Sequence, residues 1–260
     1  MNTISVLTPV YQPEPEYLTA AYDALAAQDL PAGWQWEWVV QEDGETGRAR
    51  AILPDDERIS FGFNPHGGVA ITRNLALARA KGHLIKNLDQ DDQLTTGSLA
   101  RDIAVLEAKP DVQWTTSRVL DLMPDGSTIG FDNDPPTGRL YPGQILKHWR
   151  EHNYRLPVHP TTVCIRRNLV TAVGGWMSVP GSDDTGMLIA ASMLGTGYFI
   201  GEVGLLYRKW PGQVSAQPEH KEATTWTLRM QLISERADAI AELAKQQPAS
   251  VTSPAAPTAG

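Results

Sequence analysis

The stretch HLIKNLDQDDQL, residues 83–94, is the part of the chain from which the fold can be predicted. It begins with HLIKNLD (83–89), an apolar run of strand length, and it places three aspartates within four positions: Asp89, Asp91 and Asp92. Carboxylates this close repel one another, and the repulsion raises their pKa values. A buried strand that ends in crowded negative charge needs a compensating partner, and a divalent cation is the first candidate.

Apolar runs and helical patterns alternate on the N-terminal side of this stretch. In order, they occupy residues 4–11 (strand), 15–28 (helix), 36–43 (strand), 59–63 (strand) and 67–82 (helix). This alternation predicts βαβ units, and therefore an α/β fold with a mainly parallel, Rossmann-like sheet flanked by helices. Ligands of such sheets bind outside the carboxyl ends of the strands. Because Asp43 and Asp89 both end predicted strands, we expect them to point into one crevice.

The C-terminal side continues with mixed elements. We predict helices over 95–110, 182–195 and 220–247, strands over 112–123, 128–131, 158–167 and 198–210, and a Pro- and Gly-rich loop over 132–143. The boundaries give one domain, 1–218, with a nucleotide-sugar half (1–92) and an acceptor half (93–218), followed by a C-terminal helix (219–247). The apolar stripe of this helix fits either packing on the domain or a homodimer interface. The tail 248–260 has too little apolar content to fold, so disorder is expected there.

Composition limits the classes of function. The chain has 260 residues, a net charge of −8 and a pI of about 5.2, so nothing electrostatic favours nucleic acid as a partner. The single cysteine, Cys164, excludes an intrachain disulfide framework and reads as a buried apolar residue. No segment reaches the roughly 18 apolar residues of a membrane span, and no signal peptide opens the chain. The sequence therefore predicts a cytoplasmic enzyme acting on small molecules.

Six motifs, taken in order, give the chain a resemblance to the family 2 glycosyltransferases. They are ISVLTPVYQ (4–12), VVQEDGET (39–46), NPHGGVAITRNLALARAKG (64–82), NLDQDDQL (87–94), GGWMSVPGSDDTGMLIAASMLGTG (174–197) and YRKWPGQVS (207–215). Each motif alone is weak, but their order and spacing are specific for the family, though not for a substrate. The resemblance implies a GT-A fold with a smaller acceptor-side region. It also implies transfer of a sugar from a nucleoside diphosphate, UDP before GDP or dTDP, with inversion.

The aspartates after the fourth predicted strand would hold the metal ion of such an enzyme. Mg²⁺ or Mn²⁺ suits a site made only of oxygen ligands and neutralises the charge that develops on a leaving diphosphate. In an extended segment, residues two apart face the same way, so Asp89 and Asp91 can act together. By resemblance, Asp91 is the direct ligand and Asp89 lies nearer the ribose or reaches the metal through water. Asp92 caps the next helix in our interpretation.

The resemblance also assigns nucleotide contacts. Asp43 is expected to accept a hydrogen bond from an N–H of the base, although the EDG sequence is equally typical of a turn. The remaining contacts are assigned to Thr8, Pro9, Tyr11, Arg73 and Arg208, with Arg73 on the base or the diphosphate and Arg208 on the diphosphate.

Asp183 and Asp184 begin the predicted helix 182–195, and they occupy the position of the family's paired acids. By resemblance, one of them deprotonates the acceptor for direct, inverting displacement. The spacing to Gly195 favours Asp184, and which of the two is the base stays open. Acidic residues also stabilise a helix N-terminus without any catalytic role.

The last motif departs from the family pattern. Trp210 stands where the family often has a histidine that completes the metal site, and an indole cannot ligate a cation. Coordination then relies on Asp91, diphosphate and water, or on a substitute such as His159. Trp210 could also stack on a sugar or an aromatic acceptor.

Other functions are weighed against this one. The chain has no P-loop, no dinucleotide-binding G-x-G-x-x-G after the first strand and no G-x-S-x-G nucleophile elbow. Two alternatives remain: a nucleotide-sugar-binding protein of the same fold without turnover, and a nucleotidylyltransferase. A small soluble acceptor is expected because no membrane helix is predicted.

Overall fold

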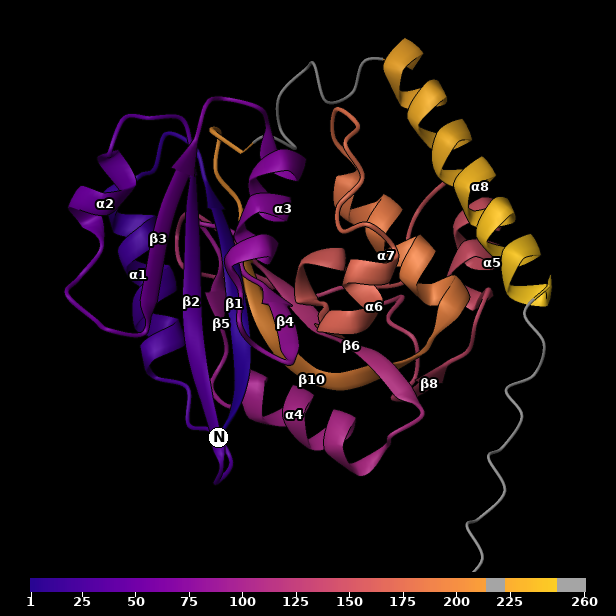
Figure 1. Cartoon of the computed structure of the whole chain (residues 1–260), viewed down its shortest axis with the longest axis horizontal. Helices are drawn as coiled ribbons and strands as arrows, with labels where there is room; N and C mark the ends of the chain where they lie inside the picture. Colours follow the sequence, from indigo (N-terminus) through magenta and orange to yellow (C-terminus); the bar gives the residue numbers. More distant parts are fainter. Residues whose placement is uncertain (214–222, 247–260) are drawn as a thin grey trace, which may run out of the picture.

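One sheet of ten strands runs through the described part of the chain, residues 1–213 and 223–246, in a computed structural model of the protein (Figure 1). The strands are β1 (Asn2–Val10), β2 (Trp34–Asp43), β3 (Ile59–Asn64), β4 (Leu84–Asn87), β5 (Gln93–Leu94), β6 (Val112–Leu122), β7 (Thr128–Ile129), β8 (Gly138–Leu140), β9 (Cys164–Arg166) and β10 (Thr196–Arg208). Their order is β3-β2-β1-β4-β9-β6-β10-β5, with β7 paired to β6 and β8 to β10. Every predicted strand has a counterpart, but 158–167 is reduced to the three residues of β9 and 128–131 to the two residues of β7.

Helices cover the sheet. They are α1 (Pro15–Ala26), α2 (Arg48–Ile52), α3 (Val69–Arg79), α4 (Ser98–Ala108), α5 (Gln144–Glu151), α6 (Arg167–Ala172), α7 (Asp183–Leu194) and α8 (Ala223–Gln246), with a 3-10 turn, η1, at Pro160–Thr162. The α/β fold with helices flanking a central sheet is confirmed. Three helices, α2, α5 and α6, had not been predicted.

The direction of the strands creates the edge on which the site lies. β1 pairs in parallel with β2 and β4, and β2 pairs in parallel with β3. β6 and β10 form a second parallel pair, and antiparallel β9 joins the two sets by pairing with β4 and β6. Since β1, β2 and β4 all run the same way, their carboxyl ends meet at one edge, as expected for an α/β sheet.

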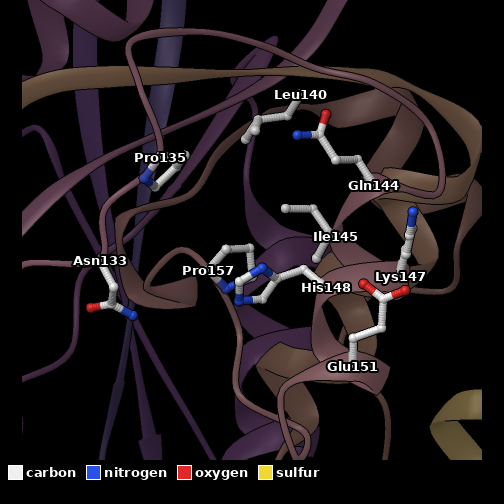
Figure 2. Close-up of a pocket in the computed structure, with 9 residues that line it drawn as sticks. All are labelled: Asn133, Pro135, Leu140, Gln144, Ile145, Lys147, His148, Glu151 and Pro157. Carbon is white, nitrogen blue, oxygen red and sulfur yellow. The ribbon is translucent and has the colours of Figure 1, made fainter.

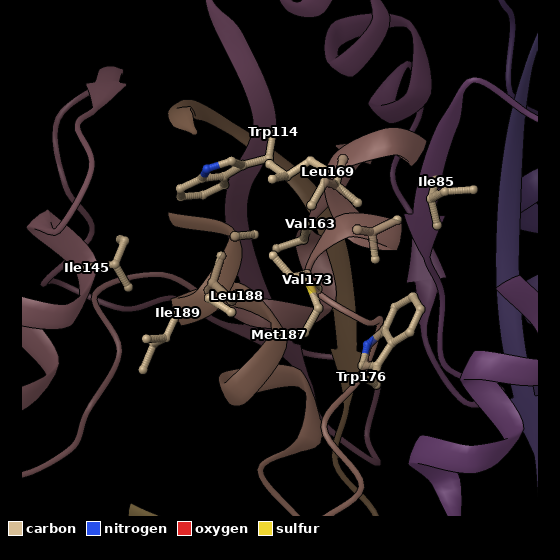
Figure 3. Close-up of a cluster of buried hydrophobic side chains, with 14 of the residues drawn as sticks. Ile85, Trp114, Ile145, Val163, Leu169, Val173, Trp176, Met187, Leu188 and Ile189 are labelled. Carbon is tan, nitrogen blue, oxygen red and sulfur yellow. The ribbon is translucent and has the colours of Figure 1, made fainter. Parts of the chain in front are cut away.

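Apolar side chains fill a core on each face of the sheet. One cluster packs α1, α2 and α4 against the sheet through residues such as Leu18 and Ile103. The other cluster, part of which Figure 3 shows, packs α7 against the sheet and also contains residues of α8. The second cluster includes Trp114, Trp176 and Met187. Each fully buried side chain of this size contributes roughly 1.5–3 kcal/mol, so the core fixes where α7 begins.

Residues 158–167 differ from the prediction of one strand. The chain forms η1 first, and only Cys164–Arg166 pair as β9. Pro160 has no N–H to give to a ladder and favours the first position of a helical turn. The buried ammonium of Lys86 donates to the carbonyl of Thr162 at 2.6 Å, which stabilises the turn against the sheet. The predicted loop 132–143 likewise contains a short strand, β8.

The two predicted halves share this single sheet. β4, which belongs to the predicted half 1–92, pairs with β9, which belongs to the half 93–218. α8 (Ala223–Gln246) lies within the predicted helix 219–247 and packs along α7 (Figure 1). The predicted tail 248–260 lies outside the described residues. In the described ranges, no helix has both the length and the apolar character that a membrane crossing requires.

Candidate active site

Asp43, the last residue of β2, is fixed by the loop that follows β3. Its Oδ1 accepts hydrogen bonds from the backbone N–H of Gly67 (2.7 Å) and from Nδ2 of Asn64 (3.2 Å). Its Oδ2 accepts one from the backbone N–H of Gly68 (3.0 Å) and lies 3.1 Å from Nδ1 of His66. Only 5% of the residue is exposed. The carboxylate therefore anchors loop 64–68, and a base N–H could reach it only by sharing these acceptors.

The end of β1 differs from the expectation that Thr8, Pro9 and Tyr11 all line the site. The Thr8 hydroxyl is buried, donating to the carbonyl of Leu88 (2.7 Å) and accepting from Nε1 of Trp38 (2.8 Å). Pro9 is buried as well. Thr8 and Pro9 are thus buried, whereas Tyr11 is 46% exposed and reaches the surface.

Tyr11 joins two loops at this edge. Its ring stacks on His66, with centroids 4.8 Å apart. Its backbone N–H donates to Oε1 of Gln90 (3.1 Å), and its carbonyl accepts from Nε2 of the same amide (3.0 Å). Loop 64–68 and the NLDQDDQL turn are therefore connected through the end of β1.

Arg73 connects an acid at the end of β4 with an acid at the start of α7. This α3 residue is 6% exposed. It donates from Nη2 to Oδ1 of Asp89 (2.5 Å) and from Nη1 to Oδ2 of Asp183 (2.7 Å). Burial lowers the pKa of Arg73, but the carboxylates of Asp89, Asp183 and Asp184 outweigh it and raise the pKa overall. A permanently charged guanidinium thus joins the end of β4 to the start of α7, which sequence spacing alone did not predict.

Asp91 is held from the end of β10. Its Oδ2 accepts a hydrogen bond from Nε1 of Trp210 (2.6 Å), and its backbone carbonyl accepts one from Nε of Arg208 (2.9 Å). The Arg208 guanidinium also lies over the ring of Tyr17, 4.3 Å from the centroid. The tryptophan in the place of the family's histidine is therefore a hydrogen-bond donor to the predicted metal ligand.

Protein groups offset much of the acidic crowding in the NLDQDDQL turn. Asp89 pairs with Arg73, Asp91 with Trp210, and buried Asp92 accepts from the backbone N–H of Arg208 (2.9 Å). Desolvation raises the pKa of Asp91, and it raises that of Asp92 well above its usual range, with repulsion between the carboxylates adding to both. Burial and repulsion thus store unfavourable electrostatic energy that a cation would relieve.

Asp183 and Asp184 differ in how they are held. Asp183 is 4% exposed and bound to Arg73. Asp184 is more exposed, and its Oδ1 accepts from the backbone N–H of Thr185 (2.6 Å). Desolvation raises the pKa of both carboxyls, and the positive charge of Arg73 opposes the rise. The second oxygen of Asp184 is engaged by no described residue, which leaves it available to a ligand.

The side-chain oxygens available as metal ligands fit a hard divalent cation only in part. Asp89 and Asp91 each keep one oxygen that no other described residue engages. Within 1–213 and 223–246, however, no three His, Cys, Asp or Glu side chains are grouped so that they could hold a metal ion. Two aspartate oxygens suit Mg²⁺ or Mn²⁺ if a diphosphate and water supply the other ligands.

His159 is not gathered into such a group. It precedes η1, and its ring packs on Tyr207 with centroids 4.7 Å apart. Its Nδ1 is buried without a hydrogen-bond partner among the described residues. Desolvation lowers the pKa of His159 to about 4, so the imidazole is neutral near pH 7.

Two hollows are lined by residues other than those predicted for the site. One, of about 250 Å³, is lined by Leu140, Ile145, His148 and neighbouring residues of β8 and α5 (Figure 2). The other, of about 350 Å³, is lined by Arg118, Phe131, Asp132 and Asp134, and the two share Pro135. Neither hollow contains a predicted site residue.

Some residues of the site escaped sequence reasoning. Asn64, His66 and Gln90 hold the loops at the sheet edge. The NPHGG sequence was a signal for the first two, since glycine amides after a strand can bind an anion. Nothing in the sequence indicated that this anion would be the protein's own Asp43.

Comparison with known proteins gives a family. The model described as "Glycosyl transferase family 2" matches residues 5–167. Putative teichuronic acid biosynthesis glycosyltransferase TuaG of Bacillus subtilis (strain 168) is 31% identical over 105 residues, 38% of this chain and 40% of that protein. Poly(ribitol-phosphate) beta-N-acetylglucosaminyltransferase TarS of Staphylococcus aureus is 30% identical over 112 residues, 41% of this chain and 19% of that protein. The matched parts therefore span less than half of these relatives.

A likeness among solved structures covers more of the chain. Residues 1–349 of S. aureus TarS in complex with UDP-GlcNAc superpose with a TM-score of 0.66 at 18% identity, over 93% of this chain and 70% of that one. The same protein with UDP gives a TM-score of 0.64. At this identity the likeness shows a shared GT-A fold. α7 and its two aspartates lie beyond the residues that the family model matches.

Proposed function

The chain belongs to glycosyl transferase family 2, and from that premise we propose that it is a glycosyltransferase that uses a nucleoside-diphosphate sugar as donor. UDP-GlcNAc is the first donor to test, because TarS has been solved with it. The acceptor we propose is a hydroxyl group of a small molecule or saccharide. The reaction we propose is metal-dependent and inverts the anomeric configuration.

The observation that carries the proposal is the Arg73 bridge. One guanidinium binds Asp89, which lies at the donor-side strand end, and Asp183, which begins α7. The two acidic motifs are about 90 residues apart in sequence and are nevertheless held within one side chain's reach. A donor on one side and an acceptor hydroxyl on the other could meet there, as a displacement reaction requires.

Asp184 is the base in this proposal. Asp183 is neutralised by its ion pair with Arg73, whereas Asp184 keeps an oxygen that no described residue engages. Its raised pKa makes the ionised form a stronger proton acceptor. The carboxylate would take the proton from the acceptor hydroxyl as that oxygen bonds to the anomeric carbon. The bond from this carbon to the diphosphate breaks with its electron pair on the leaving group, and the configuration inverts.

The free oxygens of Asp89 and Asp91 would hold Mg²⁺ or Mn²⁺ together with the diphosphate. When bound, the cation supplies the positive charge that stabilises the leaving diphosphate. Trp210 keeps the second Asp91 oxygen occupied, so Asp91 would present a single oxygen. Arg208 is the cation that we propose for the phosphates, because its side chain is held beside this turn by the Asp91 carbonyl and the ring of Tyr17.

Tyr11 is the proposed platform for the nucleoside. Its half-exposed ring and that of His66 present stacked aromatic surface at the strand ends. Stacking of a base on such surface contributes about 1–3 kcal/mol in other nucleotide complexes. A base seated there would lie close to loop 64–68, where Asp43 could share an acceptor with a base N–H.

A donor screen and a turnover assay test the proposal. UDP-, GDP- and dTDP-sugars are added with and without Mn²⁺, and the melting temperature is measured; a bound donor raises it. Release of UDP from UDP-GlcNAc is then followed for the unchanged protein and for Asp91→Asn, with Asp111→Asn, at the exposed Arg139 pair, as the control. We expect release that Asp91→Asn abolishes and that Asp111→Asn leaves intact.

The outcomes separate the alternatives. A melting shift without release of UDP, under every acceptor tried, would indicate a nucleotide-sugar-binding protein. Release of pyrophosphate from UTP and a sugar 1-phosphate would indicate a nucleotidylyltransferase. The absence of any shift with all three donor classes contradicts the proposal.

A further inference from the structure

α8 is tied to the rest of the protein by arginines on its inner face. Arg229 donates from Nη1 to the carbonyl of Pro180 at 2.5 Å, and Arg236 donates from Nη2 to the carbonyl of Val173. Arg229 is 3% exposed. α8 also packs along α7, with Met230 and Ile233 in the shared core. All of α8 lies beyond the residues that the family model matches.

The carbonyl that Arg229 binds lies three residues before the acidic pair. Pro180 belongs to the segment 177–182, which connects the Gly174–Trp176 turn to α7. Val173, the partner of Arg236, lies at the end of α6, ten residues before Asp183. The two arginines therefore make the same kind of contact at different distances from the proposed base.

The segment 177–182 has two backbone hydrogen bonds of its own, from the Val179 N–H to the Met177 carbonyl (2.7 Å) and from the Met177 N–H to the Asp183 carbonyl (3.4 Å), and neither one holds Pro180. Gly181 and Ser182 both have left-handed φ values, 73° and 64°, and this conformation costs a non-glycine residue of order 1 kcal/mol. Since Ser182 is in this conformation, it makes no side-chain cap to α7. Pro180 has no N–H to donate. Because the backbone hydrogen bonds of the segment do not engage the Pro180 carbonyl, a contact from outside the segment can stabilise this strained approach to the helix.

The buried guanidinium supplies that contact. A charge-assisted hydrogen bond from a side chain that is almost fully enclosed is stronger than one at the surface. By fixing the Pro180 carbonyl, it fixes the direction in which the chain enters α7. The first turn of α7 carries Asp183 and Asp184, and displacement of a base by about 1 Å can cost roughly 100-fold in rate.

We propose that Arg229 is a positioning residue for Asp184: the α8 arginine holds the Pro180 carbonyl and thereby the start of the helix that bears the base. The expected effect on kcat rests on the proposed function. The claim that Arg229 orders the start of α7 does not depend on that function. C-terminal helix α8 is then part of the catalytic apparatus and not only a cover for the core.

The test compares Arg229→Met with Arg236→Met. Backbone amide hydrogen exchange is measured over residues 181–186, and kcat and KM are measured with UDP-GlcNAc and Mn²⁺. We expect Arg229→Met to speed exchange in this segment at least tenfold and to lower kcat at least tenfold with little change in KM for the donor. Arg236→Met should leave both at the values of the unchanged protein, although it also loses a buried contact of α8.

Two results would overturn the inference. One is equal exchange over 181–186 in both variants, and the other is an equal loss of kcat in both. If Arg229→Met does not fold, Arg229→Lys, which keeps one donor, is compared with Arg236→Lys by the same measurements. If the unchanged protein shows no transfer, the proposed function fails, while the exchange data still decide whether Arg229 orders the start of α7.

Discussion

Loop 64–68 and the NLDQDDQL turn both follow strands that end at the same edge of the sheet, and they use their carboxylates in opposite ways. Both oxygens of Asp43 are occupied by donors from loop 64–68. Asp89 and Asp91 each have one oxygen bound to a donor and one that no other described residue engages. The position at a strand end therefore predicts where a carboxylate lies. Whether the carboxylate can bind a ligand depends on whether one of its oxygens is left without a protein hydrogen-bond donor.

Asp184 gives the largest expected effect in this comparison. Asp184→Asn keeps the shape of the side chain but cannot accept a proton, so kcat should fall by roughly 10²–10⁴-fold. The melting temperature and the affinity for UDP-GlcNAc should stay close to those of the unchanged protein. Turnover assays and calorimetric titration measure both. A variant that retains more than a tenth of kcat would show that the free oxygen of Asp184 is not the base.

Arg73 gives the next largest expected effect. It pairs with Asp89 and Asp183 and forms no ion pair with Asp43, so its loss should affect only one of the two regions. Arg73→Met leaves Asp183 buried beside Asp89 without the cation between them. Loss of one partner of a buried ion pair costs about 3 kcal/mol. Urea unfolding should show this loss at pH 7, and it should shrink at lower pH as the unpaired carboxyls take up protons. A loss under 1 kcal/mol would contradict the importance of the bridge.

Asp43 should behave as an anchor. Asp43→Asn removes charge from a group that accepts two backbone hydrogen bonds, and we expect a loss of about 2 kcal/mol in the free energy of unfolding. Since loop 64–68 loosens, the affinity for UDP-GlcNAc should also fall, while kcat at saturating donor stays within a few-fold. If instead kcat falls as far as in Asp184→Asn, Asp43 belongs with the reactive carboxylates.

The smallest expected effect comes from Trp210, whose indole N–H occupies one oxygen of Asp91. Trp210→Phe keeps the ring beside Tyr17 but removes the N–H. With that donor gone, Asp91 can offer both oxygens, and Mn²⁺ affinity should rise about fivefold, the equivalent of about 1 kcal/mol. Calorimetric titration with Mn²⁺ in the presence of UDP measures it.

The matched control is Trp34→Phe, which also removes an indole N–H from a carboxylate, that of Glu107 at 2.7 Å, but at a distant place. It should leave Mn²⁺ affinity unchanged. Weaker binding of Mn²⁺ in Trp210→Phe would indicate that the indole orients Asp91 for the cation instead of competing with it.

The sequence by itself determined the α/β fold, the long strands and the two acidic motifs. Those features depend on local periodicity and on the rule that parallel strands end at one edge, and both can be read from neighbouring residues. The sequence did not predict η1. This turn replaces part of the predicted strand 158–167, and a tertiary contact from Lys86 to the Thr162 carbonyl stabilises it.

Only the tertiary structure decided what each carboxylate is bound to. Arg73 reaches Asp183 across 110 positions, and Trp210 reaches Asp91 across 119. Thr8 turned inward because Trp38 needed a buried acceptor for its indole N–H. Hydrogen-bond acceptors are assigned by distances of about 3 Å between side chains far apart in the chain, and no spacing along the sequence encodes which donors will fill them.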